Sequence, residues 1–422
     1  MANIDCYQYL LNFVQKPSNT TWKIYNKQKY GNSTVYHIIL TLESFPYTNR
    51  HIWEHQIFIY VPDILERTLF FMRIGSGKLN EVHPINTTII DMSCKLKTIM
   101  IEMYDVPNQP LRFDDTNNDN HFLCEDDLMA YSWKKFINSS NIPHIINFHM
   151  VKSIIQGMNC IDAFYTTHLN MSNCQPNYIL VGASKRGSTI WLTSSVDTRV
   201  KAIIPIVYDT LNTSITIQNQ KDKYGSFATK LFPYVQHGLF DMLDHKLFAI
   251  IDPLNYDKYI NIPKFIINAS NDNFFAPDSS NYYYDLIKGM KYLRYIPNAN
   301  HYIEFNSLQK QIECIYDIIL NKKKYEYSIT NTNNVINILN INTTNKIINV
   351  NIWYSQNDIF DFGIHQFVPF HCINIDSCIS NEIEINVNDT INKQKTKKWF
   401  VYMIEIKFDS DFIITSPIYV FK

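Results

Sequence analysis

The sequence predicts an α/β protein built on a doubly wound, mainly parallel sheet. Residues 178–183 (YILVGA) form an apolar run that enters a tight turn, and a helix-like segment follows at 188–196. A second buried-strand pattern comes directly after it, at 200–207. Strand, helix and strand in immediate succession indicate a parallel sheet, because neighbouring parallel strands need a long crossover connection.

Other segments extend this pattern along the chain. Apolar or alternating runs that predict strands lie at 36–42, 54–61, 68–74, 97–104, 263–268 and 292–296. Helical spacing of apolar residues is found at 125–137, 145–167, 278–287 and 304–320. Residues 209–252 have no strand period, so we expect them to form a helical insertion over the top of the sheet.

The composition changes at about residue 325. Asparagine and threonine then alternate with isoleucine and valine, and a period of two recurs at 335–341, 347–353, 382–387, 399–407 and 412–421. This alternation predicts a small, sandwich-like antiparallel β domain. We therefore expect an α/β domain over residues 1–324, with strands from about residue 36, and a C-terminal β domain over residues 325–422.

Composition and charge exclude several classes of protein. A hydrophobic content of 46% in 422 residues is typical of a globular protein, and the net charge of −1 argues against a nucleic-acid partner. No apolar run is long enough to span a membrane. The N-terminus lacks the pattern of a signal peptide, which favours a cytoplasmic location, with secretion as the alternative. Eight cysteines without a repeated spacing are expected to be free thiols, the alternative being a Cys372–Cys378 pair.

The turn after residues 178–183 has the sequence Gly182-Ala-Ser184-Lys-Arg-Gly187. A serine between small residues at a strand-to-helix turn is typical of the nucleophile elbow of α/β-hydrolases, in which the two backbones pass close together. The usual form is Gly-x-Ser-x-Gly, whereas here Arg186 holds the second glycine position and the glycine comes one residue later. By itself such a serine is more often a helix cap or a small spacer.

Two more residues complete a triad in the order that α/β-hydrolases use. Asp272 follows the strand at 263–268, and His301 follows the strand at 292–296. A serine nucleophile needs a neutral imidazole to accept its proton and a carboxylate to orient that imidazole. We therefore expect Ser184, Asp272 and His301 to be catalytic, with Asp209 and Asp278 as lower-ranked alternatives for the acid.

An acyl-transfer site also needs backbone donors for the developing oxyanion. The N–H of Lys185, directly after the nucleophile, is the first expected donor, and the loop Gly75-Ser76-Gly77 is the expected source of the second. Lys185 and Arg186 also place two cations beside the elbow, which predicts binding of an anionic substrate group, with plain surface charge as the alternative.

No cofactor and no metal site are expected. His51 and His55 are four residues apart, so they share a face of a strand, but the sequence offers no third ligand beside them. Packing or surface roles are the simpler interpretation of both histidines.

The same motifs resemble a known family, the PhoPQ-activated pathogenicity-related proteins, which include the autocrine proliferation repressor proteins. The similar stretches are 106–111 (VPNQPL), 125–127 (EDD), 182–187 (GASKRG), 200–212, 251–253, 271–278 (NDNFFAPD) and 295–298 with His301, and residues 399–420 resemble the C-terminal end of the family. The resemblance implies an α/β-hydrolase core with a C-terminal β domain. It places Ser184, Asp272 and His301 at the positions of the family's triad and implies no particular substrate.

Two functions follow from these observations. The first is a serine hydrolase that cleaves a small-molecule ester, or an amide, through a covalent acyl-enzyme. The alternative is a non-catalytic regulatory or signalling protein on a hydrolase scaffold, which binds a protein partner through the C-terminal β domain. An intact triad favours the enzyme, because a protein that only binds has no need of it.

Overall fold

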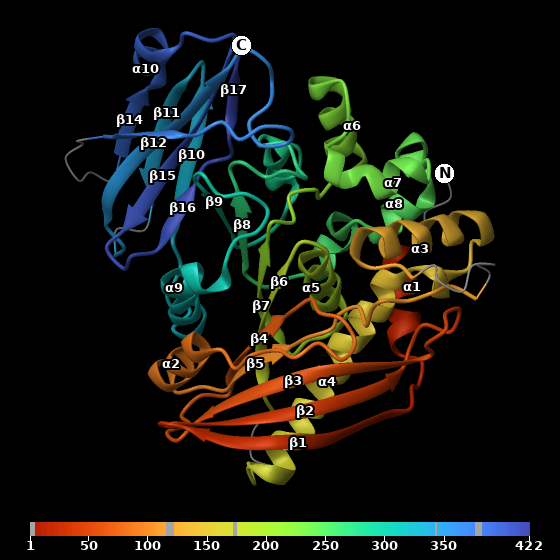
Figure 1. Cartoon of the computed structure of the whole chain (residues 1–422). Helices are drawn as coiled ribbons and strands as arrows, with labels where there is room; N and C mark the ends of the chain where they lie inside the picture. Colours follow the sequence, from red (N-terminus) through yellow and green to blue (C-terminus); the bar gives the residue numbers. More distant parts are fainter. Residues whose placement is uncertain (1–4, 115–121, 172–174, 342–343, 376–381) are drawn as a thin grey trace. The chain divides into compact units, whose positions relative to one another are not determined.

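The computed structural model describes the chain except for residues 1–4, 115–121, 172–174, 342–343 and 376–381 (Figure 1). The chain divides into two compact units, residues 1–208 with 231–264 and residues 209–230 with 265–422. The expected division at residue 325 stays a prediction, and the possible partner Cys378 lies outside the described residues.

The elements follow each other in the order of Figure 1. The strands are β1 Thr20–Tyr30, β2 Ser33–Glu43, β3 Ile52–Pro62, β4 Leu69–Ile74, β5 Met100–Met103, β6 Asn177–Ala183, β7 Val200–Ile206, β8 Lys264–Ala269, β9 Lys291–Ile296, β10 Tyr327–Thr332, β11 Val335–Asn340, β12 Ile347–Asn357, β13 His371–Asn374, β14 Glu382–Asn386, β15 Trp399–Phe408, β16 Ile413–Thr415 and β17 Tyr419–Phe421. The α-helices are α1 Cys6–Val14, α2 Thr87–Leu96, α3 Glu125–Ser139, α4 Ile146–His168, α5 Lys185–Val196, α6 Thr213–Tyr224, α7 Phe232–Gln236, α8 Lys246–Ile251, α9 Gln309–Leu320 and α10 Val387–Gln394.

A large mixed sheet forms the centre of the first unit. Its strands lie in the order β1-β2-β3-β5-β4-β6-β7. The pairs from β1 to β5 are antiparallel, and those from β5 through β4 and β6 to β7 are parallel. The parallel strands are almost wholly apolar and buried, as expected for strands covered on both faces.

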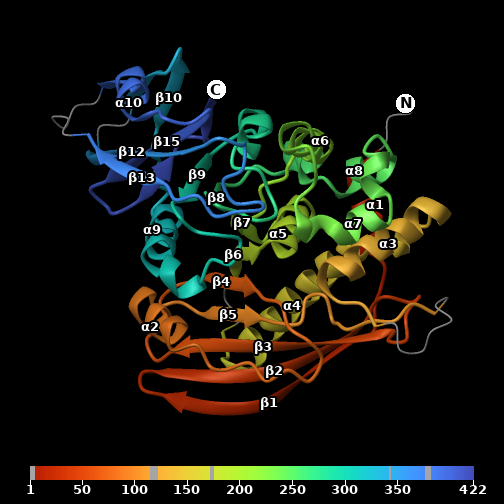
Figure 2. The same ribbon diagram turned by 45° about the horizontal axis from the view of Figure 1, so that its top comes forward.

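Helices cover both faces of this sheet. His55 of β3 contacts Ser153 of α4 at 3.0 Å, whereas Tyr60, which points to the opposite face of the same strand, accepts a hydrogen bond from the backbone of Asn86 before α2. Figures 1 and 2 show the long helix α4 running along β1–β3, where Tyr36 packs against Phe164. The predicted α/β-hydrolase fold, doubly wound around its sheet, is confirmed.

The second unit combines β8 and β9 with the C-terminal strands. Two antiparallel sheets follow α9, one of β10-β11-β14 and one built from β13-β12-β15-β16 with β17 paired to β15. The predicted antiparallel sheets at the C-terminal end are thus confirmed. The predicted helical insertion is also present, because residues 209–252 contain α6, α7 and α8.

Three local predictions were wrong or incomplete. Strand β1 begins at Thr20, well before residue 36, and was missed because most of its side chains are exposed and give no clear alternation of apolar residues. Residues 97–104 contain only the short β5, preceded by the unexpected α2. Residues 278–287 form only short 3-10 turns instead of a helix, with the side chain of Tyr283 fully buried.

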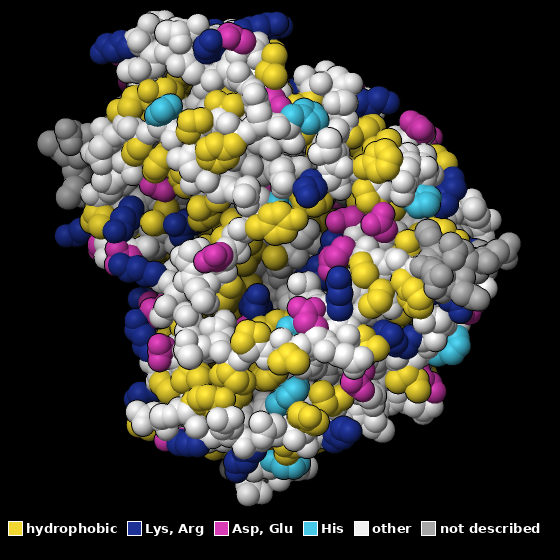
Figure 3. All heavy atoms as spheres, viewed as in Figure 1, with side chains coloured by type: hydrophobic (Ala, Val, Ile, Leu, Met, Phe, Trp, Pro, Cys, Tyr) yellow, Lys and Arg dark blue, Asp and Glu magenta, His cyan; other side chains and the backbone are white. Residues whose placement is uncertain are grey.

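Charged groups of both signs are interspersed over the face of the molecule shown in Figure 3, in keeping with the near-zero net charge. Among the helices that the structure describes, none combines the length and the apolar character needed to cross a membrane.

Candidate active site

Ser184 occupies the sharp turn between β6 and α5. Its backbone has φ 54° and ψ −127°, a conformation that residues other than glycine rarely adopt. The turn is held by a hydrogen bond of 2.8 Å from the N–H of Ser184 to the carbonyl of Ile206, at the end of the neighbouring β7. A non-glycine residue kept in this conformation at a strand–helix junction is the hallmark of a nucleophile elbow.

The glycines on either side are required by close packing. A Cβ atom on Gly182 would lie 2.6 Å from the carbonyl oxygen of Arg186. A Cβ atom on Gly187 would lie 2.9 Å from Cβ of Tyr208 and 3.2 Å from the carbonyl oxygen of Gly182. Gly187 therefore allows the close approach of strand and helix that the motif needs, although it stands one residue later than usual.

Asp272 and His301 form a buried pair in the second unit. Nδ1 of His301 lies 2.8 Å from Oδ2 and 3.0 Å from Oδ1 of Asp272, and the side chains are only 5% and 3% exposed. The Asp272 carboxylate also accepts hydrogen bonds from the backbone of Phe274 at 2.7 Å and of Phe275 at 3.3 Å. The ring of Phe274 covers the imidazole, with 4.1 Å between ring centroids. This geometry fixes the imidazole with Nδ1 toward the acid, which leaves Nε2 as the basic nitrogen.

The loop that bears Asp272 is anchored by the C-terminal part of the same unit. The side-chain amide of Asn271 donates to the carbonyls of Phe362 at 2.6 Å and Val368 at 2.7 Å. Gly363 packs so closely that a Cβ atom there would lie 2.5 Å from the carbonyl carbon of Asn271. On the histidine side, Asn298 and Phe370 exchange two hydrogen bonds of 2.7 and 3.0 Å. Residues 362–370 thus hold both the loop that bears Asp272 and the loop that leads to His301.

The two alternative acids have other partners. Asp209 is fully buried and accepts hydrogen bonds of 2.6 Å from the hydroxyls of both Tyr283 and Tyr295. Its burial raises the pKa to about 8, although the two tyrosine hydroxyls act in the opposite direction. Asp278 pairs with Lys223. The acid that lies against His301 is therefore Asp272.

Lys185 and Arg186 are buried in an ion-pair cluster instead of being free at the surface. Arg186 makes a two-pronged contact of 2.7 and 2.8 Å with the carboxylate of Glu125. Lys185 lies 2.8 Å from Glu125 and 3.1 Å from Asp126. Burial alone would raise the pKa of Glu125, but the charges and hydrogen bonds of Arg186 and Lys185 outweigh it and hold that pKa well below its usual range. These four residues, Glu125, Asp126, Lys185 and Arg186, are called the Glu125 cluster below. The cluster connects the first turn of α5 to the start of α3.

The same cluster reaches the loop expected to hold the second oxyanion donor. The side-chain amide of Gln109 donates to Glu125 at 2.5 Å and to the carbonyl of Gly77 at 3.1 Å. The N–H of Gly75 already donates to Met103 at 2.7 Å, so the N–H groups of Ser76 and Gly77 are the better candidates for an oxyanion donor. Lys185 is the first residue of α5, where a backbone N–H has no acceptor within its helix.

A metal site finds no support in the described part of the chain, where no group of three or more His, Cys, Asp or Glu side chains is placed to hold an ion. His55 is buried between Ser153, 3.0 Å from one ring nitrogen, and the carbonyl of Tyr104, 3.3 Å from the other. Both of its nitrogens therefore have partners within the protein.

The structure thus brings Asp272 and His301 together in the second unit and places Ser184 on an elbow in the first. Sequence reasoning assigned no role to Glu125 and Gln109, which connect the elbow to the loop at 75–77. Both residues lie in stretches that resemble the family, at 106–111 and 125–127, but for Glu125 the local sequence shows only an acidic helix start, which usually reflects the helix dipole alone.

Comparison with known proteins supports a family assignment. The model of the family described as PhoPQ-activated pathogenicity-related protein matches residues 10–363. Autocrine proliferation repressor protein A of Dictyostelium discoideum is 30% identical over 320 residues, which cover 73% of this chain but only 63% of that relative.

Among solved structures, the acetyl xylan esterase of Paenibacillus sp. R4 has a TM-score of 0.49 at 12% identity, covering 75% of this chain and 92% of its own. Acetyl xylan esterase 1 of Thermoanaerobacterium sp. JW/SL YS485 has a TM-score of 0.47 at 13% identity, covering 73% and 92%.

Proposed function

Because this chain belongs to the PhoPQ-activated pathogenicity-related protein family, we propose that it is a serine hydrolase that cleaves small-molecule esters through a covalent acyl-enzyme. The observation that carries the proposal is the strained backbone of Ser184 at the junction of β6 and α5. The buried Asp272–His301 pair supports it, because this pair supplies the base and the orienting acid that such a serine needs.

In the proposed reaction, Oγ of Ser184 attacks the acyl carbon while Nε2 of His301 accepts the hydroxyl proton. Asp272 holds the Nδ1–H of the imidazole and stabilises the imidazolium that forms. The imidazolium then donates its proton to the leaving alkoxide, and the ester bond breaks. Water, deprotonated by His301, hydrolyses the acyl-enzyme and regenerates Ser184. This sequence requires that Ser184 Oγ and His301 Nε2 meet within hydrogen-bonding distance.

The oxyanion formed on the substrate carbonyl needs two aligned N–H donors. Lys185 supplies one from the start of α5, and Ser76 or Gly77 supplies the other. The Glu125 cluster positions both donors, since its carboxylate binds the side chains that follow the nucleophile and, through Gln109, the carbonyl of Gly77. Binding of an anionic substrate group by Lys185 or Arg186 stays a proposal, and such a group would compete there with Glu125 and Asp126.

Covalent labelling tests the proposal. A fluorophosphonate probe should label the purified protein, and mass spectrometry of the digest should place the label on Ser184. Ser184→Ala should abolish labelling. Ser188→Ala is the matched control, because Ser188 lies one helical turn away, is buried, and has no hydrogen-bond partner for its hydroxyl within the described structure. Undiminished labelling of Ser184→Ala would rule out the assignment.

A second function is favoured by one comparison. The relative from Dictyostelium discoideum is named a proliferation repressor, which suggests that the present chain regulates cells by binding a partner. The C-terminal sheets are the proposed binding surface, and they expose apolar side chains such as Leu339 and Ile348. A proliferation assay separates the two functions: full repression by Ser184→Ala favours binding, and its loss favours catalysis.

A further inference from the structure

The imidazole of His301 is bordered by aromatic side chains of the second unit. The ring centroids of Phe274, Phe275 and Tyr302 lie 4.1, 5.8 and 5.8 Å from that of the imidazole. Phe274 and Phe275 are buried, whereas Tyr302 is 68% exposed. The ring of Tyr302 stands at 85° to the imidazole, in an edge-to-face contact. Tyr302 therefore offers an aromatic ring to the solvent directly beside the proposed base.

The loop that carries Tyr302 is held in place by hydrogen bonds. The N–H of Tyr302 donates to the side chain of Asn300 at 2.9 Å. The carbonyl of Ala299 accepts from the N–H of Asn271 at 3.0 Å, which connects this loop to the one that bears the proposed acid. The exposed ring is thus attached to a backbone that is fixed relative to the imidazole.

The proposed reaction determines which part of a substrate comes closest to this ring. Nε2 of His301 donates a proton to the alkoxide oxygen of the departing alcohol, so that oxygen must come within about 3 Å of Nε2. The carbon atoms attached to the oxygen then lie next to the imidazole and its neighbouring rings. The acyl group is instead bonded to Ser184, and its carbonyl oxygen faces backbone N–H donors. Aromatic side chains around His301 therefore contact the alcohol part of an ester.

We propose that Tyr302 binds the alcohol part of the ester and gives the enzyme a preference for esters of arylalkyl alcohols, such as benzyl esters. This role rests on the proposed hydrolase function and names its substrate class. Two aromatic rings pack well edge to face or offset, with centroids about 4.5–7 Å apart. The side chain of a tyrosine has only two rotatable bonds before its hydroxyl, so it loses little conformational entropy when a ligand ring packs against it.

Two acetyl esters test the proposal. Benzyl acetate and methyl acetate form the same acetyl-enzyme, and their alcohols have similar acidity. A difference in kcat/KM between them therefore reports contacts of the alcohol during acylation. The wild type should prefer benzyl acetate. Tyr302→Ala should lower the ratio of kcat/KM for benzyl acetate to that for methyl acetate by about three- to tenfold. Tyr302→Phe keeps the ring and should keep the ratio.

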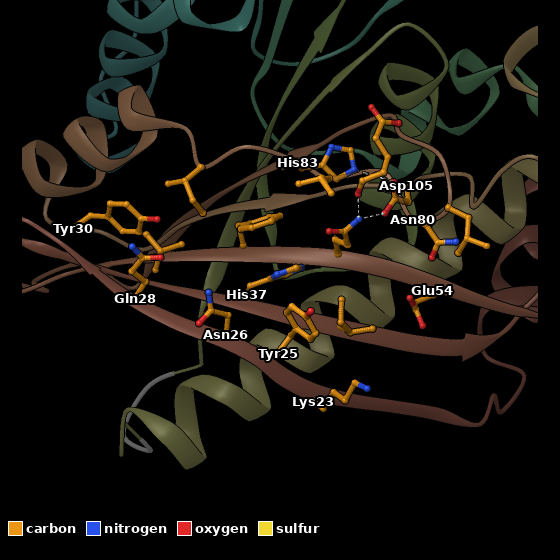
Figure 4. Close-up of a pocket in the computed structure, with 18 residues that line it drawn as sticks. Lys23, Tyr25, Asn26, Gln28, Tyr30, His37, Glu54, Asn80, His83 and Asp105 are labelled. Atoms are coloured by element: carbon orange, nitrogen blue, oxygen red, sulfur yellow. Dashed lines mark hydrogen bonds and ion pairs between the residues drawn. The ribbon is translucent and has the colours of Figure 1, made fainter.

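Tyr25→Ala is the matched control. Tyr25 is 70% exposed and meets His37 edge to face at 5.2 Å, much as Tyr302 meets His301. It lies instead in a cavity of about 580 Å³ lined by β1–β3, where Figure 4 shows it beside His37. Its strand β1 is the edge strand of the sheet, with β2, β3, β5 and β4 between it and β6. This variant should keep the ratio of the wild type, and all variants should keep its unfolding temperature.

Three outcomes would overturn the proposal: an unchanged ratio in Tyr302→Ala, an equal fall in Tyr302→Phe, or an equal fall in Tyr25→Ala. Labelling of Ser184 by a fluorophosphonate separates this role from the hydrolase function. Labelling together with an unchanged ratio leaves the hydrolase standing and removes the role of Tyr302. Absence of both labelling and ester hydrolysis removes both.

Discussion

The carboxylate of Asp272 holds His301 and two backbone N–H groups at once, which makes it the most constrained acid of the proposed site. Both carboxylate oxygens lie within hydrogen-bonding distance of Nδ1 of His301, which favours the neutral imidazole with its proton on Nδ1.

Asp272→Asn should slow labelling by fluorophosphonate on the order of 10²–10⁴-fold. The amide can donate to Nδ1 of His301, which moves the imidazole proton to Nε2 and removes the base. The measurement is the second-order labelling rate at constant pH. Asp278→Asn is the control, since Asp278 is a buried acid close in sequence that pairs with Lys223. Similar losses in both variants would mean that Asp272 has no special role.

The raised pKa of Asp209 predicts that the stability of the folded protein depends on pH. Its pKa in the folded protein, about 8 because of burial, is above the value of about 3.9 in an unfolded chain. The folded state therefore favours the neutral carboxyl, whose stabilisation is complete below pH 4 and is lost as the pH rises toward 8. Wild-type stability should fall relative to Asp209→Asn by about 1.4 kcal/mol per pH unit over this window. Urea unfolding at pH 5 and pH 8 measures the difference, and parallel pH profiles would contradict the prediction.

At the scale of helices and loops, the Glu125 cluster joins helix α5, which follows the turn of Ser184, to helix α3. Arg186 also donates to the carbonyl of Val106 at 2.6 Å, so one side chain joins α5 to the loop at 106–110 as well as to α3. Through these contacts, and through Gln109, the cluster positions the loops at 75–77 and 106–110 relative to α3 and α5.

Glu125→Gln should lower the free energy of unfolding at pH 7 by about 1–3 kcal/mol, because it leaves Arg186 and Lys185 without their carboxylate. The side chain of Glu125 is 35% exposed, which keeps the expected loss moderate. Its pKa is depressed in the folded state, so this stabilisation is present above the unfolded pKa of about 4.3 and is lost as the pH falls through the folded value.

The difference between wild type and Glu125→Gln should therefore shrink as the pH falls below 4. Denaturant titrations from pH 7 downward give this difference directly. Asp127→Asn is the matched control, because Asp127 lies in the same first turn of α3 and is exposed. An equal effect of both substitutions would assign the stabilisation to the helix dipole instead of to the ion pairs.

For the whole molecule, the compact units do not follow the chain in simple blocks. The second unit includes residues 265–324 together with all C-terminal strands, and the segment 362–370 anchors the loops of Asp272 and His301. The C-terminal β region that holds these two loops is therefore part of the proposed site.

Removal of residues 325–422 should therefore abolish labelling of Ser184 and lower the unfolding temperature, since Asn271 and Asn298 lose their partners in residues 362–370. The measurements are labelling and thermal unfolding of the truncated chain. Full labelling of residues 1–324 would instead establish the predicted independent domain.

Much of the framework follows from the sequence by itself. Long apolar runs with no alternation predicted the buried strands β4, β6, β7 and β8, because such runs can only be buried. The sharp turn at Ser184 was also predicted from the local sequence, because small residues are needed wherever a strand and the following helix pass so closely. The order of Ser184, Asp272 and His301 was visible for the same reason: each follows a recognisable strand.

Only the tertiary structure decided which polar groups meet. From the sequence, Lys185 and Arg186 were expected to bind an anionic substrate group, with surface charge as the alternative, yet both pair with Glu125, about 60 residues away in the chain. The choice of Asp272 over Asp209 depended on which carboxylate faces the imidazole and which faces two tyrosine hydroxyls. A periodic pattern reports whether a side chain is buried, but not what it is buried against, and pairing between distant polar groups is settled only when the chain is packed.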